Sequence, residues 1–247
     1  MRSLRFCSHR QAERAALAAL ILAVSASAQI GGGLQPLNVV NSATLGAGEA
    51  LAPLTLATVF GRFQGVSAER ASVAPLPTTL SNAQVLVNGS AAPLLYASES
   101  QINFLIPPAT SVGSAGIRVT VGGQSAGEAT VEIQESSPAL FVSSFDTARP
   151  AVAVNADGAT NSQSNPAQRG ARVTLFATGL GRNATEETVG AMLRLRRVDA
   201  AVITADPVVP ALWRIQVTVP NETDAGQAPA AIYTNGAASN TLSVWIQ

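Results

Sequence analysis

Polar side chains stand among apolar ones in the stretch PLLYASESQINFLIPP, Pro93 to Pro108, which first suggests an active site. Gln101 and Asn103 are the residues that buried chemistry would use. Residues 101–106 read QINFLI, however, so apolar side chains alternate with Gln101, Asn103 and Leu105. A period of two is typical of a β-strand with one face in the core and the other in solvent. We therefore predict that both amides lie on the solvent-facing side of a strand and need no catalytic explanation.

Carboxylates are the remaining groups that could catalyse a reaction. A glycoside hydrolase needs two of them, one as the acid and one as the nucleophile or base. The acidic residues fall at predicted loops and strand ends, and no two of them stand out as a pair. We interpret them as solvated loop residues and keep a carboxylate-dependent glycan hydrolase as the alternative function. The aspartates concerned are Asp146, Asp157, Asp199, Asp206 and Asp224.

One loop carries a weak calcium signature. Segment 155–165 reads NADGATNSQSN, and Asn155, Asp157 and Asn161 offer side-chain oxygens of the kind that a hard cation binds. The spacing is not that of an EF-hand, and Asx turns account for the composition equally well. These three residues are the weak calcium candidate, and we otherwise expect no metal and no cofactor.

Histidine, cysteine and lysine are nearly missing from the chain. Cys7 is the one cysteine, His9 is the one histidine, and the 15 basic residues are all arginine. Cys7 and His9 both lie in an N-terminal segment that we expect to be removed. The mature chain then lacks the histidine base of a Ser or Cys nucleophile and the His and Cys ligands of a zinc site. The sequence therefore predicts a protein that is not an enzyme of these classes.

The N-terminus has the order of a secretory signal peptide. Four arginines within residues 1–14 precede ten apolar residues, Ala15 to Val24, and then the small residues Ala26 and Ala28. The apolar run is too short to cross a bilayer, which takes about 20 residues. We predict cleavage after Ala28, a secreted or periplasmic location, and no membrane span in the mature chain.

The expected mature chain has no excess of basic groups. Removal of residues 1–28 leaves 11 arginines and 14 acidic residues. Nucleic-acid binding relies on basic groups that neutralise phosphates, so we expect no nucleic-acid partner. Arg194, Arg196 and Arg197 lie close together on one predicted strand. We interpret them as a charged edge that resists pairing with other sheets, and a contact with an anionic polymer is the alternative.

The chain contains one unit of roughly 100 residues twice. Three pairs of segments recur in the same order: TVFG (58–61) with TLFA (174–177), INFLIP (102–107) with IQVTVP (215–220), and GIRVTVGGQSAGEATVEI (116–133) with AAIYTNGAASNTLSVWI (230–246). Each unit shows short alternating runs separated by Gly, Pro, Asn and Ser, which predict strands. About seven short strands in roughly 100 residues are typical of an immunoglobulin-like β-sandwich.

The strands of the first unit are expected near 54–60, 83–87, 92–98, 101–106, 116–121 and 129–133. Asn88-Gly89 predicts a type I′ hairpin turn. Arg196-Arg197 stand there in the second unit, and because arginine disfavours positive φ, we predict a turn of different shape. The predicted organisation is a signal peptide (1–28), a flexible leader (29–37), sandwich 1 (38–142), a linker (143–150) and sandwich 2 (151–247).

Four segments, VNGSAAPLLYASESQINFLIP, NADGATNSQSNPA, VTLFATGLG and NGAASNTLSVWI, resemble a secreted C-terminal domain family that is abundant in acidobacteria. That family is related to IPT/TIG-type immunoglobulin-like domains. The resemblance covers nearly all of residues 38–247. It implies two tandem β-sandwiches on an exported bacterial protein, and it implies no activity. FGRFQG (60–65) and Arg196-Arg197 depart from the family pattern, which implies local differences in loop shape.

Two outward-facing aromatic residues are the candidate binding site. Alternation in the last two strands turns Tyr233 and Trp245 outward and Ile232 inward. Pairing of Ile232 with Leu242 would place the two aromatics about 13 Å apart on one sheet face, as a platform for sugar rings or an apolar partner surface. The alternative is that both pack against the first unit or the linker. Trp213 is expected in the core.

These observations together favour an exported, non-enzymatic tandem immunoglobulin-like protein. Its role would be structural, adhesive, or the binding of extracellular polysaccharide or of another secreted or cell-surface protein. The alternatives are the carboxylate-dependent glycan hydrolase and an accessory module of a secreted enzyme.

Overall fold

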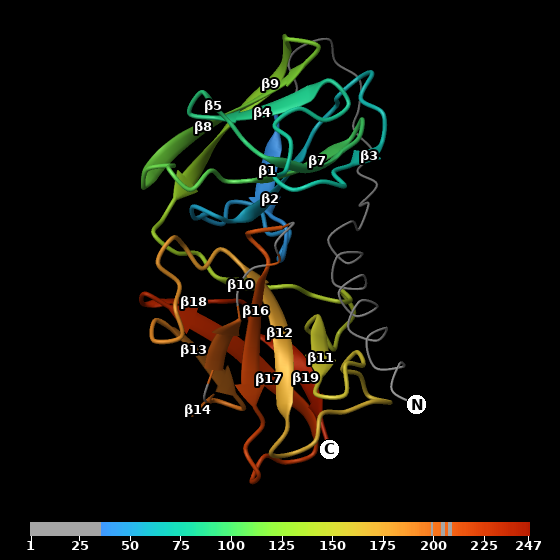
Figure 1. Cartoon of the computed structure of the whole chain (residues 1–247), viewed down its shortest axis with the longest axis vertical. Coiled ribbons are helices and arrows are strands. Elements are labelled where there is room, and N and C mark those ends of the chain that lie inside the picture. Colours follow the sequence, from blue (N-terminus) through green and yellow to red (C-terminus); the bar gives the residue numbers. More distant parts are fainter. Residues whose placement is uncertain (1–35, 199, 204–205, 207–208) are drawn as a thin grey trace.

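The computed structural model describes residues 36–198, 200–203, 206 and 209–247. Its regular elements are all β-strands, arranged in two stacked bodies (Figure 1). The expected signal peptide and its cleavage site after Ala28 lie outside the described residues, as does the leader up to residue 35. Leu37, at the end of the expected leader, packs into the first core. Within the described ranges no helix is long and apolar enough to cross a membrane.

The first sandwich consists of two antiparallel sheets. One sheet has the order β1 (Asn38–Asn41), β2 (Leu56–Phe60), β7 (Gln101–Leu105), β6 (Leu94–Ala97) and β3 (Glu69–Arg70). The other has the order β5 (Ser90–Ala91), β4 (Ala83–Val87), β8 (Gly113–Val121) and β9 (Gln124–Ile133). Leaving out the short β3 and β5, this is the ABED sheet and CFG sheet of an immunoglobulin-like sandwich. All six strands expected from the sequence of this unit overlap a strand of the structure.

The second sandwich repeats this order. Its first sheet contains β10 (Ala139–Leu140) and β11 (Ala153–Asn155), which both pair with β12 (Arg172–Thr178), followed by β16 (Trp213–Thr218) and β15 (Ala200–Ile203). Its second sheet contains β14 (Arg196–Val198), β13 (Val189–Leu193) and β17 (Gly226–Thr234), which pairs with both β18 (Ala237–Ala238) and β19 (Leu242–Ile246). The predicted fold, two tandem immunoglobulin-like sandwiches, is confirmed.

The first hairpin of each CFG sheet has the same turn. Asn88-Gly89 have φ values of 48° and 81°, as the predicted type I′ turn requires. In the second sandwich the turn is Arg194-Leu195, with φ values of 48° and 65°, and Leu193 pairs with Arg196 across it. The prediction of a different turn at Arg196-Arg197 is therefore wrong. The turn lies two residues earlier, and pairing of the flanking strands imposes its conformation on unfavourable residue types.

Three apolar clusters organise the molecule. Two of them fill the sandwiches, around residues such as Phe104 and Ile117 in the first and Ile215 and Ile232 in the second. The third cluster joins the sandwiches, because it contains buried side chains from both. From the first half it takes Ala43, Leu56, Ala71, Leu76, Leu95 and Leu105, and from the second half Ala139, Phe141, Val152, Phe176, Val209, Ala211 and Leu212.

Hydrogen bonds reinforce this contact between the sandwiches. The Leu56 amide donates to Oγ1 of Thr178 at 2.8 Å, and the Ser137 amide donates to the Gly179 carbonyl at 2.8 Å. Arg182 donates to the carbonyls of Pro108 and of Thr110. β10 pairs with β12, so residues 139–140, which were predicted to belong to sandwich 1, hydrogen-bond within a sheet of sandwich 2.

The strand β7 is buried along its whole length, so the prediction for Gln101 and Asn103 is wrong. Gln101 is 5% exposed and Asn103 is 0% exposed. The alternation itself is correct, because Ile102 and Phe104 pack in the first core. The other face carries Leu105, which packs in the third cluster. The alternation shows which residues of a strand share a face. It does not show whether the second face is exposed to solvent or covered by other parts of the protein.

Candidate functional site

The structure confirms which way the predicted aromatic pair faces. Ile232 and Leu242 are buried in the second core, whereas Tyr233 and Trp245 are half-buried on the opposite face of the same sheet. Trp213, which was expected in the core, is half-buried and packs against the second core.

The predicted pairing of Ile232 with Leu242 is wrong by two residues. Ala230 lies opposite Leu242, and Gln227 lies opposite Trp245. The reason is the tight two-residue turn at 235–236, which is followed by a one-residue register shift between β18 and β19. Tyr233 is six residues along β17 from Gln227, so Tyr233 and Trp245 are separated by about 20 Å at ~3.3 Å per residue.

The Tyr233 ring is already in contact with other groups. It lies across Gly190, where a Cβ atom would come within 2.0 Å of the ring Cζ atom. The guanidinium carbon of Arg197 lies over the ring, 5.0 Å from its centroid, in a cation–π contact. The side chains of Gln227 and Ser243 both donate to the Ala148 carbonyl, at 2.9 and 2.7 Å. Tyr233 and Trp245 are thus two separate aromatic surfaces, and segment 143–150 contacts the sheet near Trp245.

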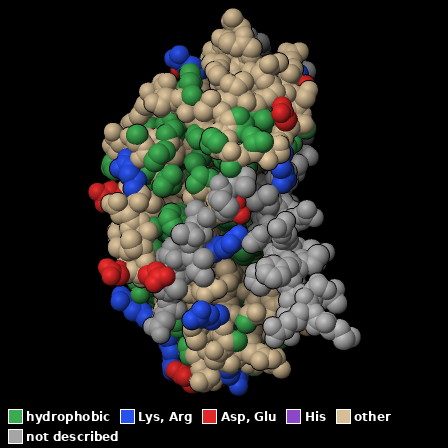
Figure 2. Space-filling view, in the orientation of Figure 1, with side chains coloured by type: hydrophobic (Ala, Val, Ile, Leu, Met, Phe, Trp, Pro, Cys, Tyr) green, Lys and Arg blue, Asp and Glu red, His purple; other side chains and the backbone are tan. Residues whose placement is uncertain are grey.

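The three arginines singled out in the sequence lie at a hairpin tip and at the edge of a sheet. Arg196 and Arg197 are exposed on β14, the edge strand of its sheet, whereas Arg194 is in the turn. Arg196 forms an exposed ion pair of 3.4 Å with Glu222. On the face seen in Figure 2, basic and acidic side chains are interspersed, which fits the interpretation of a charged, solvated surface.

The candidate calcium ligands hydrogen-bond with protein groups. Oδ1 of Asn155 accepts from the side-chain amide of Asn161 at 2.9 Å, and Oδ1 of Asn161 accepts from the Trp245 amide at 2.8 Å. Oδ1 of Asp157 accepts from the Ala159 amide at 2.9 Å, as in an Asx turn. Asn155 and Asn161 therefore fasten their loop to β19, and the described residues contain no group of three His, Cys, Asp or Glu that could hold a metal ion.

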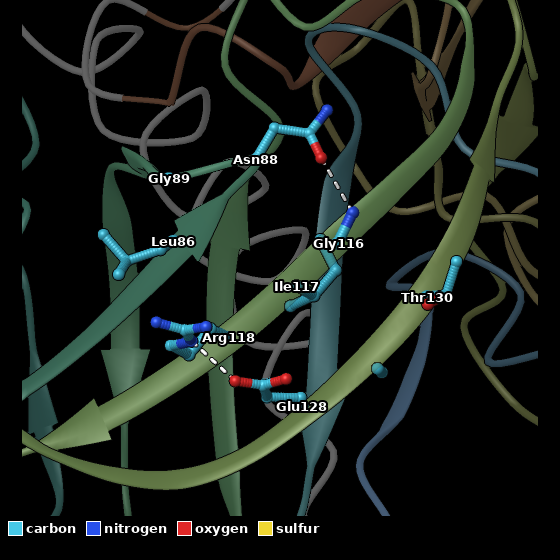
Figure 3. A pocket seen from close by; sticks show the side chains of 9 residues that line it. Leu86, Asn88, Gly89, Gly116, Ile117, Arg118, Glu128 and Thr130 are labelled. Carbon is cyan, nitrogen blue, oxygen red and sulfur yellow. Dashed lines mark hydrogen bonds and ion pairs between the residues drawn. The ribbon is translucent and has the colours of Figure 1, made fainter.

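A hollow of about 400 Å³ lies on the outer face of the CFG sheet of the first sandwich (Figure 3). Its centre is Gly116 on β8, which has Thr130 of β9 opposite it. The Asn88 side chain flanks Gly116 on the other side, and its Oδ1 accepts from the Gly116 amide at 2.8 Å. The residues lining the hollow are Leu86, Asn88, Gly89, Gly116, Ile117, Arg118, Glu128, Ala129 and Thr130.

An ion pair forms one end of the hollow. Nε of Arg118 donates to Oε1 of Glu128 at 2.7 Å, and both side chains are more than half exposed. Leu86 lies opposite Arg118 on β4 and adds an apolar wall. The hollow therefore offers hydrogen-bond donors and acceptors without net charge. The sequence did not predict it, because Gly116 stood at the start of the predicted strand 116–121, whereas it lies inside β8.

A second groove, of about 650 Å³, lies at the far end of the second sandwich, where Asp157, Arg172 and Gln247 are among the lining residues. Among the described lining residues, Asp157 is the one acidic side chain of this groove, and Glu128 is the one acidic side chain of the hollow. Neither set of lining side chains therefore supplies the two carboxylates that a glycoside hydrolase requires.

Comparison of the sequence with protein families and with curated proteins finds no match. Among solved structures, the chain is similar to SGBP-B of the Bacteroides ovatus mixed-linkage glucan utilization locus, in complex with a mixed-linkage heptasaccharide. The identity is 15% over 80% of this chain and 42% of that one, with a TM-score of 0.37. This chain therefore spans less than half of that protein.

Two further neighbours are a bacterial adhesin and an S-layer protein. The Escherichia coli adhesin FdeC is 11% identical over 89% of this chain and 66% of its own, with a TM-score of 0.26. Domains 5–6 of the S-layer protein SbsC are 15% identical over 87% of this chain and 97% of theirs, with a TM-score of 0.28. The immunoglobulin-like assignment rests on the strand order of the two sandwiches.

Proposed function

We propose that the protein is an exported, non-catalytic tandem immunoglobulin-like protein that binds extracellular polysaccharide. The observation that carries this proposal is the hollow over Gly116. It has side chains that can hydrogen-bond a ligand, and its single carboxylate, Glu128, is held by Arg118 at 2.7 Å. A site with one paired carboxylate supports binding rather than glycosidic hydrolysis, which needs a second carboxyl group.

The proposal includes export with removal of residues 1–28 and membership of the secreted acidobacterial domain family related to IPT/TIG domains. The order of basic, apolar and small residues supports the former, and the four matching segments support the latter. Mass spectrometry of the exported protein is expected to give the mass of a chain that begins at Gln29. A product that retains Cys7 would contradict export by this route.

The function is tested by incubating the purified chain with a panel of insoluble plant and microbial polysaccharides. We expect the protein to be depleted from solution by at least one of them, with no soluble sugar released. Retention by none of them overturns the binding role. Release of sugar that is abolished by one Asp or Glu substitution would show the alternative, a carboxylate-dependent hydrolase.

A further inference from the structure

We propose that the hollow over Gly116 is a subsite for a neutral, hydroxyl-rich sugar chain, and this inference rests on the proposed function. In this proposal Gly116 leaves room for the ligand, and the first sandwich binds it.

Gly116 has no structural reason to be glycine. Its φ is not among the positive values, and a Cβ atom placed there would meet only Oδ1 of Asn88, at an ordinary distance of 3.9 Å. Gly113 in the same strand differs, because its φ of 110° requires glycine. A glycine within a strand destabilises the strand relative to alanine, and it often marks a place where a ligand approaches the backbone. Gly116 lines the hollow, so a larger side chain at this position would occupy part of it.

The polar groups around Gly116 match hydroxyl groups. Because Oδ1 of Asn88 is used by the Gly116 amide, the Asn88 amide nitrogen is directed away from Gly116 (Figure 3) and can donate to a ligand. Thr130 offers a hydroxyl that both donates and accepts, and Arg118 and Glu128 offer donors beside an acceptor. Sugar hydroxyls likewise donate and accept, so they can use every one of these groups.

Charge and backbone pairing argue against other ligands. The Arg118–Glu128 pair has no net charge, so the hollow has no electrostatic preference for an anionic polymer. β8 is paired on both edges, with β4 and with β9, so a peptide cannot add to it as a further strand. The volume of about 400 Å³ falls within the range of known ligand sites, about 300–1,000 Å³.

The second sandwich provides an internal comparison. Pro229 occupies the position of Gly116, because it pairs with Ser243 and its carbonyl accepts from the Arg194 amide at 2.8 Å, as the Gly116 carbonyl accepts from Asn88. The proline ring fills the position that is open in the first sandwich. The Ser243 hydroxyl, which corresponds to Thr130, donates to the Ala148 carbonyl. The duplicated site therefore has its centre filled and its hydroxyl engaged.

The test is to fill the hollow without disturbing the fold. Gly116→Val places a β-branched residue in a strand, where such residues are favoured, and Gly116→Ala is the smaller change. Retention is measured on insoluble neutral polysaccharides, such as cellulose and xylan, and on insoluble anionic polysaccharides, at low and high salt. We expect at least a tenfold loss of retention with Gly116→Val, with an unchanged or higher melting temperature. Arg118→Ala should also weaken retention, and Pro229→Ala, the matched control, should bind as the parent does.

Several outcomes would overturn the proposal. If the parent is retained and both Gly116 variants are retained equally well, the hollow is not the subsite, although the proposed function stands. If anionic polysaccharides alone retain the parent, and added salt releases the protein from them, the proposed ligand class is wrong. If no polysaccharide retains the parent, the proposed function itself fails. If Gly116→Val does not fold, Gly116→Ala and Arg118→Ala decide.

Discussion

The side-chain amide of Gln101 donates a hydrogen bond of 2.7 Å to Oδ1 of Asn103, two residues along the same strand. Thr58 on β2 donates to the same oxygen at 3.4 Å. All of these groups are buried. Removal of this acceptor leaves the buried Gln101 amide without that partner, whereas the Thr58 hydroxyl keeps a contact of 2.8 Å with Oγ of Ser42.

Asn103→Ala is therefore expected to lower the free energy of unfolding by about 1–3 kcal/mol. Chemical denaturation measures the change. Gln216 is the matched control, because it has the equivalent place in the repeat and bonds Arg172 at the surface. Gln216→Ala should stay within about 0.5 kcal/mol of the parent, and equal losses at the two positions would contradict the buried network.

Gly179 is expected to be essential for the contact between the sandwiches. It has a φ of 75°, and a Cβ atom there would lie 2.1 Å from the Ser137 carbonyl oxygen. Gly236, with a φ of 80° and nothing within 4 Å, is the control, and Gly236→Ala should cost about 1–2 kcal/mol from backbone strain alone. Gly179→Ala should cost a further ~1–3 kcal/mol from overpacking. Equal melting temperatures for the two variants would contradict a close contact at Gly179.

The segment 143–150 is expected to be cut first by proteases. Phe145 is 52% exposed, so limited chymotrypsin digestion should cleave after it. The two products should still elute together, because β10 precedes the cut and pairs with β12, which follows it. Phe145→Ser should remove this cleavage. A first cut within residues 101–133, or immediate separation of the products, would contradict the predicted linker position or the described pairing.

Leu195→Gly is expected to stabilise the second sandwich. Leu195 is 84% exposed with a φ of 65°, so its side chain gains little by burial and strains the backbone. Relief of that strain should add up to about 1 kcal/mol to the free energy of unfolding, measured by thermal unfolding. The reciprocal change in the first hairpin, Gly89→Leu, should destabilise the protein by a similar amount. Destabilisation by Leu195→Gly would show that the leucine has a packing role.

Trp245→Ala is expected to weaken ligand retention and to leave stability nearly unchanged. The ring is on the outer face of β19, so its loss should cost about 1 kcal/mol or less, against about 3–5 kcal/mol for a buried tryptophan. Trp213→Ala is the comparison, because Trp213 packs against the second core and should cost more. Thermal unfolding beside a polysaccharide depletion assay measures both effects. A loss of several kcal/mol would show that Trp245 is part of the core.

The alternation of residue types predicted six strands of the first sandwich, without β1, β3 and β5, and the faces of the side chains on β17 and β19. Ile232 and Leu242 are inside and Trp245 is outside, as expected, because burial of one face determines the pattern. What covers the other face could not be predicted, since the third cluster joins residues far apart in the chain. Gln101 and Asn103 share a strand face with Leu105 and are buried, so the prediction that they face solvent was wrong.

The strand register and the shape of the surface also could not be predicted from the sequence. The tight turn at 235–236 sets a register in which Trp245 lies opposite Gln227, farther from Tyr233 than expected, and the alternation of residue types does not show the register. The hollow over Gly116 depends on the side chains that three strands bring together, whereas the sequence shows only a glycine. The Arg194-Leu195 turn could not be predicted because its residue types oppose the conformation that strand pairing imposes.

The third cluster also determines how two weak contacts would combine. It holds the first sandwich against the second through buried side chains from both, so the hollow and the Trp245 surface have a defined spacing. A polymer long enough to reach both would bind the second surface as an intramolecular step, at a high effective concentration. Little orientational freedom would be lost in that step. Long polysaccharide chains should therefore bind with far higher affinity than short fragments, each of which reaches one surface.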